Sequence, residues 1–176
     1  PYFKIQKQRT DWDKAPESFE GSANFRYKTS KTGLLKVFTS YTYGDLSLRF
    51  PNLDSLSYKD FFYQKSSNFF VNTNYRDIIG EDWTLFAGYS VGMDREDDKI
   101  NSALAGKDDV FHTAKVTVSK NIFSNSFLTF GGEVQNLDHS SSFNELKGDF
   151  TETYLAGYVE TDIFFTNDFA GRVGIR

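Results

Sequence analysis

Hydrophobic and polar residues alternate one by one along much of residues 127–176. Leu128, Phe130 and Val134 fall on one side of the alternation, whereas Glu133 falls on the other. Successive side chains leave a β-strand on opposite faces, so this period of two predicts strands. A full charge in mid-strand requires water or a polar partner, because burying an unpaired charge is costly. The pattern therefore predicts strands with one apolar face and one wetted, polar face.

The same alternation predicts eight strands. They are expected at about 19–29, 35–43, 68–78, 83–93, 110–121, 127–135, 153–165 and 169–176, after a polar stretch at 8–18. Short turns are expected at 30–33, 79–82, 123–126 and 166–168, and long connections at 50–67, 94–109 and 137–148. After Gly44 the apolar residues move from odd to even positions, which predicts a bulge near Gly44-Asp45.

Predicted strands of about 10 residues have the length that a tilted strand needs to cross a bilayer. Short turns at one end and long connections at the other are also typical of membrane barrels, whereas a soluble sandwich has strands of about 5–6 residues. Aromatic residues at the predicted strand ends would form interfacial girdles; they are Tyr27, Phe62, Tyr63, Trp83, Phe123, Phe127, Phe165 and Phe169. The predicted fold class is all-β, a transmembrane antiparallel β-barrel meander of about eight strands.

The alternation also predicts which side chains face lipid and which face the barrel lumen, and a shift of one residue would reverse every assignment in a strand. The apolar residues predicted to face lipid are Val37, Leu85, Val91, Val116, Leu128, Phe130, Val159, Val173 and Ile175. The charged residues predicted to face the lumen are Lys36, Arg76, Lys115, Glu133, Glu160 and Arg172. Opposite charges on this face are expected to pair across strands.

The composition excludes several classes of partner and site. The 20 basic and 24 acidic residues give a net charge of −4, which argues against nucleic acid as a partner, because no basic stripe is available to neutralise phosphates. The chain has no cysteine, which excludes disulfides and thiolate metal sites. No apolar run of about 18 residues occurs, so no membrane-spanning helix is predicted, while alternating strands remain compatible with a membrane.

Candidate chemical sites are few. The acidic stretch 94–109 offers carboxylates for Ca²⁺, but it lacks the spacing and the glycine of an EF-hand loop, so a solvated loop is the favoured interpretation. His112 and His139 are the only histidines and lie far apart in sequence, and no metal site is predicted. Glu160 and Asp162 have roughly the spacing of glycosidase carboxylates, yet a lumen wall explains them more simply. No catalytic, cofactor-binding or metal-binding residue is predicted, and the protein is not expected to be an enzyme.

Aromatic residues gather in the long connection predicted at 50–67. They are Tyr58, Phe61, Phe62 and Tyr63. Exposed rings of this kind stack on ligands or sugars, so these four residues form a candidate ligand loop. Packing within the loop, or a place in the girdle, is the favoured alternative.

Two stretches, 127–135 and 153–176, carry a family pattern. A strand ends in Gly132-Glu133, spaced tyrosines follow at Tyr154 and Tyr158, and a turn at Phe165-Thr166 leads to a strand that closes on Gly174-Ile175-Arg176. This order resembles the barrel of TonB-dependent outer-membrane receptors. Residues 1–176 are then interpreted as a single β-barrel segment, in which no signal peptide, TonB box or plug domain is recognised.

The resemblance implies a plugged barrel of about 22 strands in the outer membrane of a Gram-negative bacterium. Such a barrel binds a scarce nutrient, for example a siderophore, haem, a vitamin, a peptide or a glycan, and imports it with energy from TonB. The implied partners are outer-membrane lipid and lipopolysaccharide, TonB, and the plug domain of the full-length protein. A surface lipoprotein lid is a further candidate partner.

Two other classes of protein remain open from the sequence. The first is a complete small outer-membrane protein of eight strands with a structural or adhesive role, which requires the first strand to pair with the eighth. The second is a soluble lipocalin-like or sandwich binding protein, in which the apolar face would be internal. Small residues such as Gly21, Ala23 and Ala87 on the apolar face argue against this second class, because they would leave voids in a core.

Overall fold

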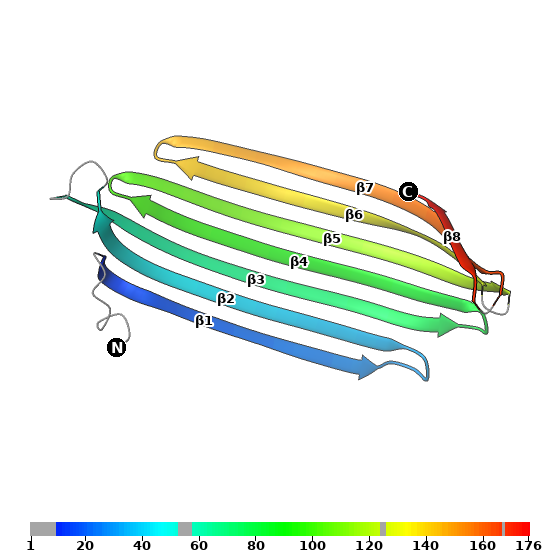
Figure 1. The fold of residues 1–176 in the computed structure, drawn as a ribbon. Helices are drawn as coiled ribbons and strands as arrows, with labels where there is room; N and C mark the ends of the chain where they lie inside the picture. The colour runs from blue at the N-terminus through cyan, green and yellow to red at the C-terminus, as the bar shows by residue number, and fades with distance from the viewer. Residues whose placement is uncertain (1–9, 53–57, 124–125, 167) are drawn as a thin grey trace.

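The computed structural model describes residues 10–52, 58–123, 126–166 and 168–176. These residues form one antiparallel sheet whose strands follow one another in sequence order, as Figure 1 shows. The strands are β1 (Asp11–Lys28), β2 (Leu34–Pro51), β3 (Lys59–Ile79), β4 (Trp83–Ile100), β5 (Ala103–Phe123), β6 (Ser126–Phe143), β7 (Leu146–Phe164) and β8 (Ala170–Ile175). The prediction of an all-β meander of eight strands is confirmed. The sheet is open, and β1 and β8 form its two edges.

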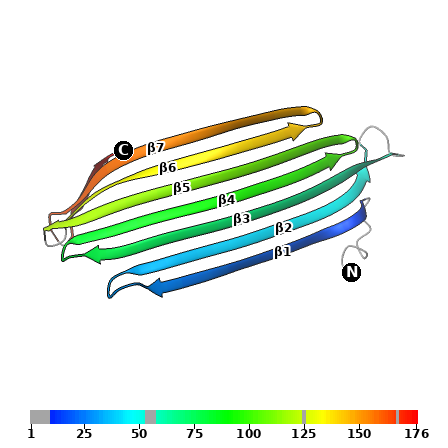
Figure 2. The same cartoon turned by 180° about the vertical axis from the view of Figure 1, so that it is seen from behind.

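The sheet is a single layer. The two opposite views in Figures 1 and 2 show no second layer of strands or helices over either side. Within the described ranges no hydrophobic residue is buried. No helix that is long and apolar enough to cross a membrane occurs in this part of the chain. A lipocalin-like or sandwich protein requires a closed, dry core, and the described residues do not form one.

The predicted strand lengths are wrong. Seven of the strands have 18 to 21 residues, and only β8 is short, with 6 residues. The stretch 94–109, predicted as a long loop, is strand apart from a two-residue turn at 101–102, and 137–148 likewise turns only at 144–145. Asn101 and Asn144 adopt positive φ angles of 55° and 53° at these turns, where asparagine is among the favoured residues. The connection predicted at 50–67 shrinks to 52–58, and β1 already begins within the polar stretch 8–18.

The alternation did not predict these strand ends, because both faces of the sheet carry polar side chains there. The backbone pairing nevertheless continues there, and hydrogen bonds between side chains cross the strands, such as Gln64–Glu96 at 2.6 Å and Asn68–Asp94 at 2.6 Å. We call this part of the sheet the overhang; it comprises 11–18, 44–51, 59–68, 94–109 and 136–153 and lies towards the left end of Figure 1.

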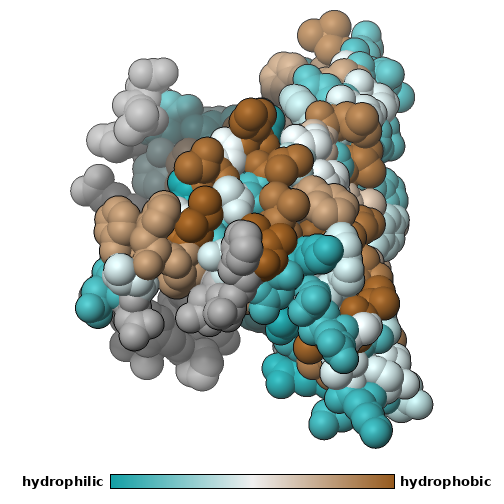
Figure 3. Space-filling view, turned by 90° about the vertical axis from the view of Figure 1, so that its right-hand side faces the viewer, coloured by the Kyte–Doolittle hydropathy of each residue, from teal (hydrophilic) through white to brown (hydrophobic). Residues whose placement is uncertain are grey.

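Three of the four predicted short turns can be placed, and they share the other end of the sheet. The connections after β1, β3 and β7 lie there, at 29–33, 80–82 and 165–169, while the turn at 124–125 falls outside the described residues. Figure 3 looks onto this end and shows apolar side chains gathered around it. The predicted girdle residues exposed near this end are Tyr27, Trp83, Phe127, Phe165 and Phe169. Phe62 and Tyr63 lie in the overhang instead, and the side chain of Phe123 is outside the description.

The bulge predicted near Gly44-Asp45 is also wrong. Strand β2 pairs with β3 without a shift of register, and the irregularities lie in the edge strand β1, on both sides of Lys14. The Lys14 ammonium lies 2.7 Å from the carboxylate of Asp45, which is only 9% exposed and also accepts a hydrogen bond from the Tyr43 hydroxyl. The hydrogen bond from Lys14 holds the pKa of Asp45 below its usual range, against the effect of burial. The reciprocal bond to Asp45 raises the pKa of Lys14.

Asp45→Asn is therefore expected to destabilise the folded protein near neutral pH. Because folding lowers the pKa of Asp45, the carboxylate stabilises the fold above its unfolded value of about 3.9, and this contribution is lost as the pH falls through the folded value. The thermal midpoints of wild type and variant should thus converge in acid. Asp13→Asn is the matched control, since its partner is Arg49 across the same two strands but Asp13 is 41% exposed, and exposed pairs contribute about 0–1 kcal/mol. Equal effects of the two substitutions at neutral pH would contradict the assignment.

Candidate functional site

The strand register sorts the side chains into two faces. Directly paired residues share a face, so Lys115 lies with its partners Gly88 and Glu133, while Val116 lies opposite with Ala87. Following the pairs through β2 to β8 places all six predicted lumen charges on one face of the sheet. The nine residues predicted to face lipid all lie on the other face.

The face with the six charges is the concave one. Along the upper part of β4, Arg95 and Asp97 are exposed, while their neighbours Glu96 and Asp98 on the charged face are partly buried. Strand β7 shows the same alternation, since Tyr158 and Glu160 are partly buried while Gly157 and Val159 are exposed. Side chains converge on the inner side of a curled sheet and separate on its outer side. We therefore name the charged face the concave face and the other the convex face.

Charges and one aromatic ring form a cluster on the concave face of β5 to β8. Lys115 lies 3.9 Å from the Glu133 carboxylate and over the Tyr158 ring, 5.2 Å from its centroid. Arg176 also pairs with Glu133, and Arg172 binds Asp162 through two hydrogen bonds of 2.5 and 2.9 Å. The depression between these groups has a volume of about 660 Å³ and is also lined by Glu160.

This cluster brings together four of the six predicted lumen charges. Lys115, Glu160 and Arg172 line the depression, and Glu133 is linked to it through Lys115. Lys36 and Arg76 lie on the same face but on β2 and β3, away from the cluster. The arrangement provides cross-strand ion pairs and hydrogen-bond donors on one face of the sheet.

The role of Tyr158 could not be found from the sequence pattern. Its ring lies against Gly131, its direct partner across β6 and β7, and its hydroxyl lies 2.5 Å from the hydroxyl of Thr117. Phe111 covers Gly92 in the same way on β5 and β4. An aromatic ring over a cross-strand glycine fills the space that the missing side chain leaves. Only the register shows that each ring faces a glycine.

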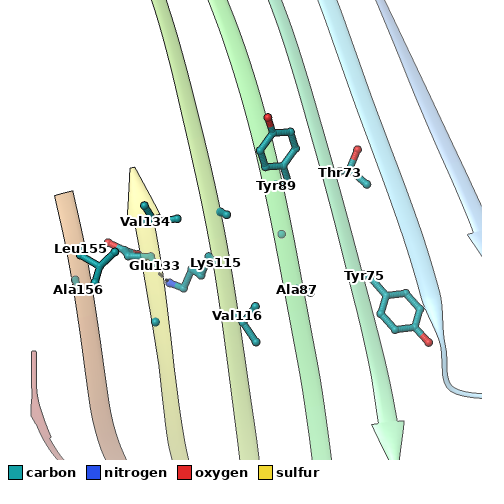
Figure 4. Close-up of a pocket in the computed structure, with 13 residues that line it drawn as sticks. Thr73, Tyr75, Ala87, Tyr89, Lys115, Val116, Glu133, Val134, Leu155 and Ala156 are labelled. Atoms are coloured by element: carbon teal, nitrogen blue, oxygen red, sulfur yellow. Dashed lines mark ion pairs between the residues drawn. The ribbon is translucent and has the colours of Figure 1, made fainter. Parts of the chain in front are cut away.

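The convex face is shallowly hollowed near the middle of its apolar band. The depression has a volume of about 590 Å³, and small residues such as Ala87, Ala114 and Gly132 form its floor. Figure 4 shows Tyr75 and Tyr89 on neighbouring strands at this place, together with the Lys115–Glu133 pair of the opposite face as a dashed line. The convex side chains remain exposed here, with Val116 at 50%.

The candidate ligand loop is not a loop. Phe61, Phe62 and Tyr63 lie within β3, and only Tyr58 belongs to the connection before it. The prediction of a loop was wrong because β3 continues into the overhang, where hydrophobic and polar residues alternate only weakly. Phe62 is on the concave face, whereas Phe61 and Tyr63 are on the convex face, where Arg49 stacks over Phe61. The four residues therefore do not form one stacking surface.

The two histidines lie on opposite faces. His112 shares a contact of 2.8 Å with the Tyr89 hydroxyl on the convex face. His139 lies on the concave face, with its Nδ1 2.5 Å from Asp109. Burial opposes the charged form of Asp109, but hydrogen bonds from Lys107 and His139 outweigh it and lower the pKa of Asp109. Within the described ranges, no three or more histidine, cysteine or acidic side chains gather as metal ligands would.

A one-layer antiparallel meander with an uncovered apolar face and a charged opposite face has the architecture of an outer-membrane β-barrel wall. Solved structures share this fold. The copper transporter OprC matches with a TM-score of 0.67 at 10% identity, over 91% of this chain and 30% of that one. The ferric citrate transporter FecA, in its unliganded form, matches with a TM-score of 0.65 at 9% identity, over 86% of this chain and 26% of that one.

A third match is BauA, the ferric preacinetobactin receptor from Acinetobacter baumannii, with a TM-score of 0.58 at 11% identity over 86% of this chain and 29% of that one. The chain thus spans less than a third of the length of each of these three proteins. No family model matches the sequence, and no curated protein sequence matches it. At these identities the likeness shows the fold, which is that of an outer-membrane barrel wall.

Proposed function

We propose that the chain forms part of the barrel of a TonB-dependent outer-membrane transporter that binds and imports a scarce nutrient. One observation carries the proposal: the convex apolar band continues across eight strands and has no protein layer over it in the described residues. Such a band requires hydrocarbon around it, because so much exposed apolar surface is unfavourable in water. The fold shared with three metal-ion or metal-chelate transporters and receptors supports the same class.

In this proposal the concave face lines the lumen. The charges of Lys115, Glu133, Glu160 and Arg172 then meet water and the plug domain of the full-length protein, and Lys36 and Arg76 extend this wall along β2 and β3. The convex band meets outer-membrane lipid and lipopolysaccharide. The overhang projects from the cell surface, where a lipoprotein lid would bind it. TonB acts from the periplasmic side.

The number of strands favours a second candidate, a complete eight-stranded outer-membrane protein. It requires hydrogen bonds between β1 and β8, which lie at opposite edges of the open sheet. Crosslinking of β1 to β8 in the membrane would support this candidate, and crosslinking of either edge to a further strand of the same protein would support the transporter.

The test uses single cysteines, since the chain has none of its own. Asp97→Cys, in the overhang, should react with a membrane-impermeant maleimide on intact cells, whereas Thr32→Cys, at the opposite end, should react only after permeabilisation. Ligand uptake should stop when TonB is deleted, while both labelling patterns persist. Surface labelling at Thr32→Cys would reverse the topology, and uptake without TonB would overturn the transporter class.

A further inference from the structure

In the overhang, apolar side chains appear on the concave face among polar ones. Below the overhang, polar side chains predominate on the concave face and apolar side chains on the convex face. Five apolar residues on the concave face of the overhang form what we call the distal patch: Leu48, Phe62, Ile100, Phe143 and Leu146. Strands β2 to β7 pair without a register shift through this region, so the change of face comes from the order of residues and not from a bulge.

Three of the five side chains of the distal patch are open to solvent, and Leu48 and Phe62 are half-buried. Ile100, Phe143 and Leu146 are 51%, 54% and 73% exposed. The convex side of the same strands carries charges, among them Lys65, Arg95, Asp97 and Lys99. Contact with lipid therefore does not explain the distal patch, which lies on the concave face and beyond the apolar band. Apolar residues gathered on one exposed face mark a binding surface.

A group of carboxylates lies beside the distal patch on the same face. We call it the acidic band; it consists of Asp94, Glu96, Asp98 and Asp109. Lys107 at 2.8 Å and His139 both pair with Asp109. Asp94 and Glu96 instead accept hydrogen bonds from the neutral amides of Asn68 and Gln64. A hollow of about 310 Å³, lined by polar side chains that include Asp94, Glu96 and Lys107, opens here.

Asp98 has one carboxylate oxygen that is not satisfied. Among the residues that the structure describes, its Oδ1 is shielded from solvent and has no hydrogen-bond partner. Burial raises the pKa of Asp98, and the charge of Glu96 adds to the effect. A positive charge placed in the band would give the Asp98 oxygen a partner and would lower the pKa of Asp98.

We infer that the distal patch and the acidic band form the entry site for the imported ligand, and that this ligand is a small cationic amphiphile. Its apolar or aromatic part lies on the distal patch, and its cationic group lies in the acidic band. The charge complementarity selects this occupant over an anionic chelate, which the four carboxylates would repel. The inference rests on the proposed function, because it takes the concave face as the wall of the lumen.

The test compares two probes that share one ring system and differ in charge. 2-Naphthylmethylammonium and 2-naphthylacetate are titrated into the purified full-length protein, and binding is followed by naphthyl fluorescence. The cation is expected to bind about 10-fold or more tightly than the anion at low ionic strength, and the preference should shrink as salt screens the carboxylates. Equal affinities, tighter binding of the anion, or no binding of either probe would overturn the inference.

Matched substitutions locate the site. Ile100→Thr on the concave face should weaken the binding of both probes. Leu104→Thr should leave the binding of both unchanged, because Leu104 lies on the convex face of the same hairpin and is similarly exposed, at 53%. Glu96→Gln should lower the affinity for the cationic probe alone, by about 3-fold or more. The substitution Asp97→Asn, at the next residue but on the convex face, should have no such effect. If the two substitutions of either pair had equal effects on binding, the probes would bind elsewhere, and the proposed site would be wrong.

Assembly is measured separately on the same preparations, by heat-dependent gel mobility of outer-membrane fractions. A wild-type protein that is absent from the outer membrane would contradict the proposed function itself. A protein that assembles there and imports a nutrient with TonB, yet shows no preference for the cationic probe, would contradict only the inference about the ligand.

Discussion

Val134→Arg is expected to sharply reduce the amount of assembled protein in the outer membrane. Val134 lies on the convex face of β6, in the middle of the apolar band, and is 36% exposed. An arginine on the lipid face costs about 2–4 kcal/mol near the bilayer midplane, because its charge must leave water or distort the membrane. The measurement is the fraction of heat-modifiable, folded protein in outer-membrane preparations of cells that express the full-length variant.

Gln135→Arg is the matched control for this substitution. Gln135 is the next residue of the same strand, is also exposed, and pairs with Thr113 on the concave face. An arginine there reaches water in the lumen, so assembly should remain close to that of wild type. Equal loss for both variants would mean that the two faces do not meet different environments, and the lipid assignment of the convex face would fail.

Gly131→Val is expected to lower the stability of the barrel by about 1–3 kcal/mol, the usual cost of overpacking a filled site. A Cβ at Gly131 would lie 2.5 Å from the Val116 carbonyl oxygen and 2.7 Å from the Tyr158 hydroxyl oxygen. Something must shift, and the nearer atom belongs to the backbone of the neighbouring strand. The thermal midpoint of the detergent-purified full-length protein reports the loss.

The neighbouring glycine provides the control. A Cβ at Gly132 would meet only the Ala156 carbonyl oxygen, at an ordinary 3.5 Å, so Gly132→Val should be tolerated. A Tyr158→Ser background should reduce the cost of Gly131→Val, because residues in contact do not contribute independently. A cost that is the same in both backgrounds would show that the ring of Tyr158 is not the obstacle.

The alternation of residues was sufficient to predict the eight strands, their order and the face of each strand residue in the apolar band. It succeeded there because each strand meets two different environments, and a period of two records that difference directly. Val116 and Lys115 are adjacent in sequence, and their opposite faces follow from this period alone. In every strand where the apolar face is continuous, the residues that were predicted to share a face do so.

The same reasoning failed in the overhang. There, both faces carry polar residues, and the signal that distinguishes a strand from a loop disappears, although the backbone pairing of β3 and β4 continues without a shift. The alternation therefore predicts a loop for the acidic stretch 94–109 and a connection for the candidate ligand loop, and the structure has strands at both places. The shift of apolar residues after Gly44 was read as a bulge, when the chain had instead moved its apolar side chains to the other face of an uninterrupted strand.

The sequence by itself determined that the chain forms alternating strands with one apolar and one charged face, because this property belongs to each strand separately. Only the tertiary structure decided which residues meet across strands. The contacts of Tyr158 with Gly131 and of Lys14 with Asp45, and the pairing of Leu48 with Phe62, join residues that are distant in the chain. Their physical origin is the register of the sheet, which depends on all the strand pairs at once and which no single stretch of sequence contains.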